Sequence, residues 1–336
     1  MAIKKVKLAL LGAGRIGQVH AKAISSNSTA ELYAVADVHT PSANAVATQY
    51  GCVVSSMDEI VSDIAVDGVV ICTSTDTHSD LIERFARAGK AIFCEKPIDL
   101  SLQRVKACLT VVEQTHTTLM IGFNRRFDPH FAAAKQAVAD GRIGRVEMVQ
   151  ITSRDPDLPP ADYIKVSGGI FRDMTIHDFD MARFMLDEEP EMVFATASSL
   201  VDPEIEALGD FDSVSVIMTT VSGKHCTISN SRRAAYGYDQ RVELHGSKGS
   251  VSVENQRPES IELATADGYI RPPLHDFFMT RYTAAYAAEI SAFIKSLTSG
   301  SKPSPNGQDG LRSLALAEAA LLSIEEKRPV QVSEIL

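Results

Sequence analysis

A glycine turn near the N-terminus constrains the fold of this chain most strongly. A short apolar run, 6–11, leads into Gly12-Ala13-Gly14-Arg15-Ile16-Gly17, and a helical pattern follows. This spacing suits a pyrophosphate. The first glycine makes the turn, the second lets the backbone approach the anion, and the third lets the helix pack on the strand. We therefore expect a strand, a turn and a helix whose N-terminus faces a phosphate group.

A second predicted strand ends in an acid at the position that a dinucleotide site requires. The run 32–36 leads into Asp37, 20 residues after Gly17, where a carboxylate binds ribose hydroxyls. Asp37 also repels a 2′-phosphate, and the three residues after it include no Arg or Lys to counter that repulsion. We predict that NAD, rather than NADP, binds to Gly12, Gly14, Arg15, Ile16, Gly17 and Asp37.

Strand and helix patterns alternate up to residue 122. The apolar run 66–72 precedes hydroxyl side chains and an imidazole at the carboxyl end of a strand, where ligands bind in parallel sheets. These side chains either contact the cofactor or cap the next helix. The alternation predicts a doubly wound parallel sheet, the Rossmann fold, as an NAD-binding domain over 1–122. The four residues concerned are Thr73, Ser74, Thr75 and His78.

Glu95-Lys96-Pro97 follows another apolar strand, 91–94. A lysine at the carboxyl end of a parallel strand, with a proline after it, is held near the cofactor crevice. Lys96 can there donate to a substrate hydroxyl and join a proton relay, and Glu95 is predicted to lie beside the cofactor. The alternative is a Lys/Glu pair on the surface at a strand end.

The pattern changes after residue 122. Strand-like stretches between 192 and 265, separated by glycine turns, predict a C-terminal α/β domain with a large, mainly antiparallel open sheet. We assign substrate binding and oligomerisation to this domain, 123–336. Tyr236 and Tyr238 either bind a polyol or serve as edge-strand aromatics. A long helix over 277–297 and another over 307–326 are predicted to pack back across the domain junction.

A helix is predicted to open from Gly168-Gly169 and to continue past Asp180. Asp173 and His177 are four residues apart in it and share one face. A carboxylate beside an imidazole can fix the tautomer of the ring and make it a base near neutral pH. The alternative is an Asp/His pair on a solvated helix face.

Charge and composition exclude several classes of protein. The net charge of −10 provides no basic face for nucleic acid. The five cysteines are scattered without metal-ligand spacing, so we expect free thiols and no metal. No segment approaches the roughly 18 apolar residues of a membrane span. We therefore predict a cytoplasmic protein with neither a membrane nor a nucleic-acid partner.

Taken together, the glycine turn, Asp37, the E-K-P motif, the paired glycines and the D-x-x-x-H motif resemble the Gfo/Idh/MocA oxidoreductase family over essentially the whole chain. Within that family, 122–128, 152–156, 171–180 and 234–240 look most like inositol 2-dehydrogenases. The resemblance implies an NAD-dependent oxidation of myo-inositol at C2 to the 2-keto sugar. It also implies a homotetramer assembled through the open sheet.

The resemblance also implies roles for individual residues. Lys96, Asp173 and His177 would be catalytic: His177 takes the proton from a ring hydroxyl, Asp173 orients the imidazole or the substrate, and Lys96 binds the reacting oxygen. Two alternatives stay open, namely another polyol or aldose (scyllo-inositol, D-chiro-inositol or glucose) and a catalytically silent NAD-binding regulator. The residues implied to bind the other hydroxyls are Arg126, Asp155, Asp157, Tyr236 and Tyr238.

Overall fold

The computed structural model describes residues 5–336, which divide into two compact units. The first unit runs to Phe127 and also takes in Thr283–Leu314. The second consists of Asp128–Tyr282 and Ala315–Leu336. A single division between residues 122 and 123, as the sequence pattern suggests, does not include this return of the chain to the first unit.

The first unit contains a six-stranded sheet whose strands are all parallel, in the order β3-β2-β1-β4-β5-β6. The order reverses between β1 and β4, and ligands bind at such a switch point, beyond the carboxyl ends of the strands. This confirms the predicted Rossmann sheet. The strands are β1 Val6–Leu11, β2 Ala30–Ala36, β3 Val53–Val54, β4 Gly68–Ile71, β5 Ala91–Glu95 and β6 Leu119–Gly122.

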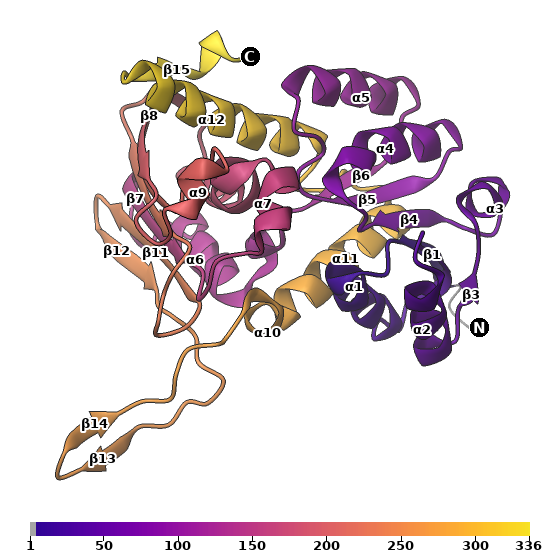
Figure 1. The fold of residues 1–336 in the computed structure, drawn as a ribbon, viewed down its shortest axis with the longest axis horizontal. Coiled ribbons are helices and arrows are strands. Elements are labelled where there is room, and N and C mark those ends of the chain that lie inside the picture. The colour runs from indigo at the N-terminus through magenta and orange to yellow at the C-terminus, as the bar shows by residue number, and fades with distance from the viewer. Residues whose placement is uncertain (1–4) are drawn as a thin grey trace. The chain divides into compact units, whose positions relative to one another are not determined.

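Helices cover both faces of the parallel sheet. On one face α1, α2 and α11 enclose an apolar core that includes Leu10, Ile24, Val46 and Phe293, and α4 and α5 lie together on the other face (Figure 1). The helices of this unit are α1 Arg15–Ser25, α2 Thr40–Tyr50, α3 Met57–Ser62, η1 Thr75–Thr77, α4 His78–Arg87, α5 Leu102–Gln114, η2 Asn124–Phe127 and α11 Thr283–Ser299.

The second unit contains a seven-stranded sheet in the order β12-β11-β7-β10-β9-β8-β15. The pair β7/β10 is parallel and the other neighbours are antiparallel, which confirms the predicted mainly antiparallel open sheet. The strands are β7 Val146–Arg154, β8 Pro190–Ser198, β9 Ser213–Thr220, β10 His225–Ser231, β11 Asp239–Gly246, β12 Gly249–Val253 and β15 Val330–Gln331.

The two faces of this sheet differ because side chains alternate along each strand. One face is buried, where α8 packs on β7 and β10 and where α6 packs on β12. The other face exposes Met148, Phe194 and Ile217. A hairpin of β13 and β14 extends away from the sheet (Figure 1). The remaining elements are α6 Pro129–Ala139, α7 Ala161–Ser167, η3 Phe171–Thr175, α8 Ile176–Leu186, α9 Glu204–Ala207, β13 Leu263–Thr265, β14 Gly268–Ile270, α10 Phe278–Arg281, α12 Gly307–Glu326 and η4 Val332–Glu334.

The single helix predicted over 277–297 is wrong. The structure has the short helix α10, a break at Tyr282 with φ −107° and ψ 19°, and then α11. Tyr282 is buried, and its ring meets the ring of Tyr238 edge-on at a centroid distance of 6.0 Å. Apolar spacing continues through the break, so the side-chain pattern does not reveal the change in the backbone. The division between the two units falls at this residue.

Candidate functional site

The glycine turn between β1 and α1 is closed by backbone contacts that only glycine tolerates. Gly12 has φ +93°, and a Cβ there would lie 2.5 Å from the carbonyl oxygen of Cys72. A Cβ on Gly17 would lie 2.1 Å from the carbonyl oxygen of Gly12. A Cβ on Gly14, by contrast, would have no described atom within 4 Å. The turn is therefore closely packed at Gly12 and Gly17 and open at Gly14, where α1 begins. The next two residues are the exposed Arg15 and the half-buried Ile16.

Asp37 lies directly after β2 and is tied to the glycine turn. Its Oδ2 accepts a hydrogen bond from the Ala13 N–H at 2.6 Å, and its Oδ1 accepts one from the His39 N–H at 2.7 Å. Val38 beside it is fully exposed. An open helix N-terminus next to a fixed carboxylate fits the pyrophosphate and ribose of a dinucleotide. The residues present therefore fit NAD.

The loop after β4 contacts the loop that carries Lys96. The His78 ring is buried, with Nδ1 2.8 Å from the carbonyl oxygen of Pro97 and Nε2 3.1 Å from that of Thr73. The hydroxyls of Thr73 and Thr77 hydrogen-bond to each other at 2.6 Å. His78 thus joins the loop after β4 to the loop after β5, both at the carboxyl ends of the strands. Of the other two predicted residues, Ser74 is exposed and Thr75 is half-buried.

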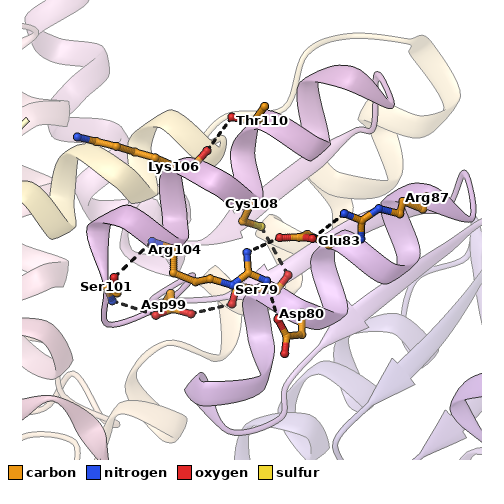
Figure 2. Close-up of polar contacts among 10 residues, drawn as sticks. All are labelled: Ser79, Asp80, Glu83, Arg87, Asp99, Ser101, Arg104, Lys106, Cys108 and Thr110. Atoms are coloured by element: carbon orange, nitrogen blue, oxygen red, sulfur yellow. Dashed lines mark hydrogen bonds and ion pairs between the residues drawn. The ribbon is translucent and has the colours of Figure 1, made fainter.

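Figure 2 shows how the chain beyond Lys96 is anchored to α4. The hydroxyl of Ser79 donates to Asp99 at 2.7 Å, and Asp99 also accepts from the Ser101 N–H at 2.9 Å. Arg104 of α5 in turn donates to Asp80 and Glu83 of α4. Lys96 itself is half-buried immediately after β5. Its backbone is therefore fixed on the C-terminal side as well as by the strand.

In the second unit, the two glycines form a turn that glycine alone fits well. Gly168 and Gly169 have φ +84° and +80°, and a Cβ on Gly169 would lie 2.7 Å from Oδ1 of Asp210. The same oxygen accepts a hydrogen bond from the Ile170 N–H at 2.9 Å. The predicted helix follows, but η3 is a wider π-helical turn that leads into α8. Such π turns occur often at functional sites.

Asp173 lies in this π turn, and its partners include Tyr163 and Arg232. The Tyr163 hydroxyl donates to its Oδ1 at 2.9 Å, and an Nη atom of Arg232 lies 3.5 Å from its Oδ2. The Arg232 side chain is 1% exposed and also lies 3.9 Å from Oδ2 of Asp210. Asp173 is thus fixed beside a buried cation and is not solvated on an open helix face. His177 follows four residues later and is half-buried.

A buried polar network fastens this helix to the sheet. Asp178 accepts hydrogen bonds from the hydroxyl of Ser153 on β7 at 2.6 Å and from the amide of Asn230 on β10 at 2.8 Å. The hydroxyl of Thr175 donates to the Asn230 side-chain oxygen at 2.7 Å. These bonds fix the rotation of α8 about its axis, and the rotation decides where His177 points.

Three loops of the second unit lie at the same end of neighbouring strands in its sheet. Arg154 at the end of β7 pairs with Ser231 of β10 and with Asp239 of β11. The loops that follow β7 and β10 therefore lie at the same edge as the loop that precedes β11. Of the predicted substrate residues, this edge carries Asp155, Asp157, Tyr236 and Tyr238, together with Arg232.

The predicted substrate residues differ in exposure. Asp157 is exposed, and Tyr236 is 50% exposed with its hydroxyl donating to Asp239 at 2.7 Å. Asp155 is half-buried, whereas Tyr238 is buried. Arg126 belongs to the first unit, where an Nη atom lies 3.0 Å from Oδ1 of Asp309. Glu95 is predicted to lie beside the cofactor, and its Oε1 lies 2.6 Å from Nε2 of His20.

Sequence reasoning missed Tyr163, Asp210 and Arg232. Each contacts the Asp173 segment from another part of the chain, and no motif spacing connects them. Arg232 follows a strand directly, and the same argument that selected Lys96 at a strand end could have selected it.

A parallel sheet in this order, its glycine turn and its acid define a dinucleotide-binding oxidoreductase fold, joined here to an α/β unit that carries an Asp/His pair. Two family models match: the oxidoreductase family with an NAD-binding Rossmann fold over residues 6–123, and the GFO/IDH/MocA C-terminal domain over residues 131–252. The chain belongs to the Gfo/Idh/MocA oxidoreductase family, which confirms the resemblance. NAD is its cofactor.

Three similar proteins illustrate this relationship. Inositol 2-dehydrogenase of Rhizobium meliloti strain 1021 is 66% identical, over 98% of this chain and 99% of the relative. A crystal structure of a myo-inositol dehydrogenase from Corynebacterium glutamicum has a TM-score of 0.94 at 43% identity, over 97% of this chain and 98% of that one. A scyllo-inositol dehydrogenase from Lactobacillus casei, solved with NAD(H) and scyllo-inositol, has a TM-score of 0.91 at 28% identity, over 98% and 100%.

No helix within residues 5–336 is long and apolar enough to cross a membrane.

Proposed function

We propose that this protein is an NAD-dependent inositol 2-dehydrogenase, which oxidises myo-inositol at C2 to 2-keto-myo-inositol (scyllo-inosose). The observation that carries the proposal is the fixed position of Asp173, which Tyr163 and Arg232 hold in the π turn four residues before His177, on a helix that Asp178 ties to the sheet. The chain also contains a dinucleotide fold and is 66% identical to a named inositol 2-dehydrogenase, which supports the assignment.

The first unit would hold NAD through the glycine turn and Asp37. The N-terminus of α1 would face the pyrophosphate, and the carboxylate of Asp37 would accept hydrogen bonds from the ribose hydroxyls. When bound, NAD supplies an acceptor for hydride at C4 of its nicotinamide ring. The loop 73–78 borders the same edge of the sheet and would contact the rest of the cofactor.

The remaining chemistry is the removal of a proton from the hydroxyl at C2. We assign this step to His177 as general base, with Asp173 orienting the imidazole or the substrate. A positioned base of this kind contributes roughly 10²–10⁴-fold to the rate. Lys96, at the end of β5, would bind the reacting oxygen and stabilise the negative charge that develops on it. Arg126, Asp155, Asp157, Tyr236 and Tyr238 would bind the other hydroxyls.

A second candidate substrate is scyllo-inositol. It is supported by the structural likeness to the Lactobacillus casei enzyme, which was solved with that inositol. The two candidates differ in the orientation of one hydroxyl, and the groups at the sheet edge would decide between them.

We further propose a cytoplasmic homotetramer. The exposed apolar residues Met148, Phe194 and Ile217 on the open face of the sheet support an association through that face, because exposed apolar patches mark protein interfaces. In this scheme the first unit binds NAD, and the second binds substrate and mediates assembly.

Myo-inositol labelled with deuterium at C2 tests the function directly. The proposal predicts that the label appears on the nicotinamide ring of the reduced cofactor and that the product is a label-free 2-keto sugar, as read by mass spectrometry. Label retained in an oxidised product would show reaction at another carbon. Faster turnover of scyllo-inositol would favour the second candidate.

A further inference from the structure

Three titratable side chains from separate elements meet inside the first unit, beneath the strand end that carries Lys96. They are His20 of α1, Glu95 at the end of β5 and Glu289 of α11. His20 Nε2 lies 2.6 Å from Glu95 Oε1, which is a hydrogen bond between buried groups. One ring nitrogen of His20, one oxygen of Glu95 and one oxygen of Glu289 all lie within 4.8 Å of one another.

Two of the three side chains are closed to solvent, and that of Glu95 is 12% exposed. His20 and Glu289 are both 0% exposed. The imidazole makes edge-to-face contacts with the rings of Phe93 and Tyr286, at centroid distances of 5.0 Å and 5.6 Å. Neither oxygen of Glu289 has a hydrogen-bond partner in the described part of the chain. A charged carboxylate in such a place costs several kcal/mol. Burial, and secondarily repulsion by Glu95, raise the pKa of Glu289 well above its usual range. The raised pKa favours the protonated form of Glu289, which carries an O–H.

The carboxyl group of Glu95 lies within 4.8 Å of that of Glu289, and two carboxyl groups at short range do not both ionise. Its remaining side faces β6, where Glu95 pairs with Gly122. A Cβ on Gly122 would lie 3.0 Å from Oε2 of Glu95. The carboxylate thus has α1, α11 and β6 around it, and the next residue in the chain is Lys96.

A metal ion explains this geometry less well than a shared proton. Two ligands of one zinc ion, each about 2.0–2.2 Å from it in tetrahedral geometry, lie roughly 3.3 Å apart. The 2.6 Å separation of His20 Nε2 and Glu95 Oε1 is shorter than that and is typical of a hydrogen bond to a charged acceptor.

We propose that His20, through its hydrogen bond, and Glu289, which lies within 4.8 Å, hold the Glu95 carboxylate in place and thereby fix the end of β5 from which Lys96 extends. His20 and Glu289 are positioning residues, and His20 also couples this strand end to α1, the helix of the glycine turn. The inference rests on the proposed function, in which Lys96 binds the reacting oxygen.

Two substitutions at Glu289 distinguish a role in positioning Lys96 from a role in fold stability alone. Glu289→Leu removes the hydrogen-bond donor of the side chain, whereas Glu289→Gln keeps an uncharged donor. The same two changes at Glu113, an exposed residue of α5, are the controls. We expect Glu289→Leu to lower kcat about 10-fold, since small misplacements near the chemistry are costly. The KM for NAD stays unchanged, because the glycine turn is untouched. Glu289→Gln restores kcat most of the way.

A second readout needs neither cofactor nor turnover. In the cofactor-free protein, amide hydrogen exchange of the peptide 92–99 should rise in Glu289→Leu and return towards wild type in Glu289→Gln. The melting temperature of Glu289→Leu should not fall, because an apolar side chain replaces a buried polar group. Gly122→Ala, which presses on Glu95 from β6, should reproduce the faster exchange and the lower kcat.

Wild-type kcat and exchange in Glu289→Leu would overturn the proposal, as would a Glu289→Gln variant as impaired as Glu289→Leu. One equivalent of metal in the wild type that is lost in Glu289→Leu would also overturn it, by showing a metal site. A wild type that reduces no NAD with inositol would defeat the proposed function alone, because the exchange readout still tests the cluster.

Discussion

Arg232 is a buried cation, 1% exposed, and it lies 3.5 Å from the Oδ2 atom of Asp173. It also lies 3.9 Å from Asp210, whose carboxylate fixes the paired-glycine turn. One guanidinium from the end of β10 therefore serves both the acid of the Asp/His pair and the turn from which its helix begins. The Asp/His pair depends on a residue far from it in sequence.

Replacing Arg232 by Met should leave these two carboxylates without their cation. Breaking a buried ion pair by removing one partner costs about 3–5 kcal/mol, and we expect a loss of unfolding free energy of about 3 kcal/mol. The adjacent Arg233 is exposed, so Arg233→Met is the matched control and should change little. Chemical denaturation measures both. Equal stability of the two variants would contradict the role given to Arg232.

Gly14→Ala should separate cofactor binding from folding. The new Cβ meets no described atom within 4 Å, and φ at this position is −69°, which alanine adopts readily. The melting temperature should stay near that of the wild type, whereas the Kd for NAD should rise at least about 10-fold because the methyl group occupies the approach to the pyrophosphate. Calorimetric titration with NAD measures the Kd. An unchanged Kd would remove the glycine turn from the cofactor site.

Asp37→Ser combined with Val38→Arg should shift cofactor preference towards NADP. The serine removes the charge that repels a 2′-phosphate, and the fully exposed position 38 can present a guanidinium to it. Val38→Arg alone is the control and should keep the preference for NAD. The ratio of kcat/KM for the two cofactors measures the shift. A double variant that still rejects NADP would show that Asp37 does not select the cofactor.

The raised pKa of Glu289 predicts a pH dependence of stability. Between the usual value of 4.5 and the higher value in the folded chain, the folded state holds a proton that the unfolded state has released. Stability from this group therefore falls as the pH rises above 4.5, and Glu289→Gln removes that loss. The difference in melting temperature between Glu289→Gln and wild type should grow from pH 4.5 to pH 8. A difference that is constant over this range would show that Glu289 is ionised in the fold.

The parallel sheet and the glycine turn could be predicted because their signals are local. Gly12, Gly14 and Gly17 are close in sequence, and the turn brings Asp37 to them over a fixed strand and helix length. The same holds for the paired glycines and the Asp/His spacing, although the π turn that begins the helix was not foreseen.

What the sequence did not reveal depends on contacts between distant segments. The break at Tyr282 follows from its burial against Tyr238, and apolar spacing runs through it unchanged. Likewise, the E-K-P motif predicts that Glu95 lies beside the cofactor but does not predict the direction of its side chain. Its carboxylate turns inward because His20 and Gly122 leave room for it there. No pattern within one element contains these partners.

In the proposed reaction NAD, Asp173 and His177 act together on an inositol. The most direct measurement is the rate of NADH formation from NAD and myo-inositol by the wild type and by His177→Ala, with the Kd for NAD determined for both. We expect steady turnover by the wild type, and a loss of at least about 10²-fold in His177→Ala with an unchanged Kd for NAD. No NADH from the wild type with any inositol, or wild-type turnover by His177→Ala, would contradict it.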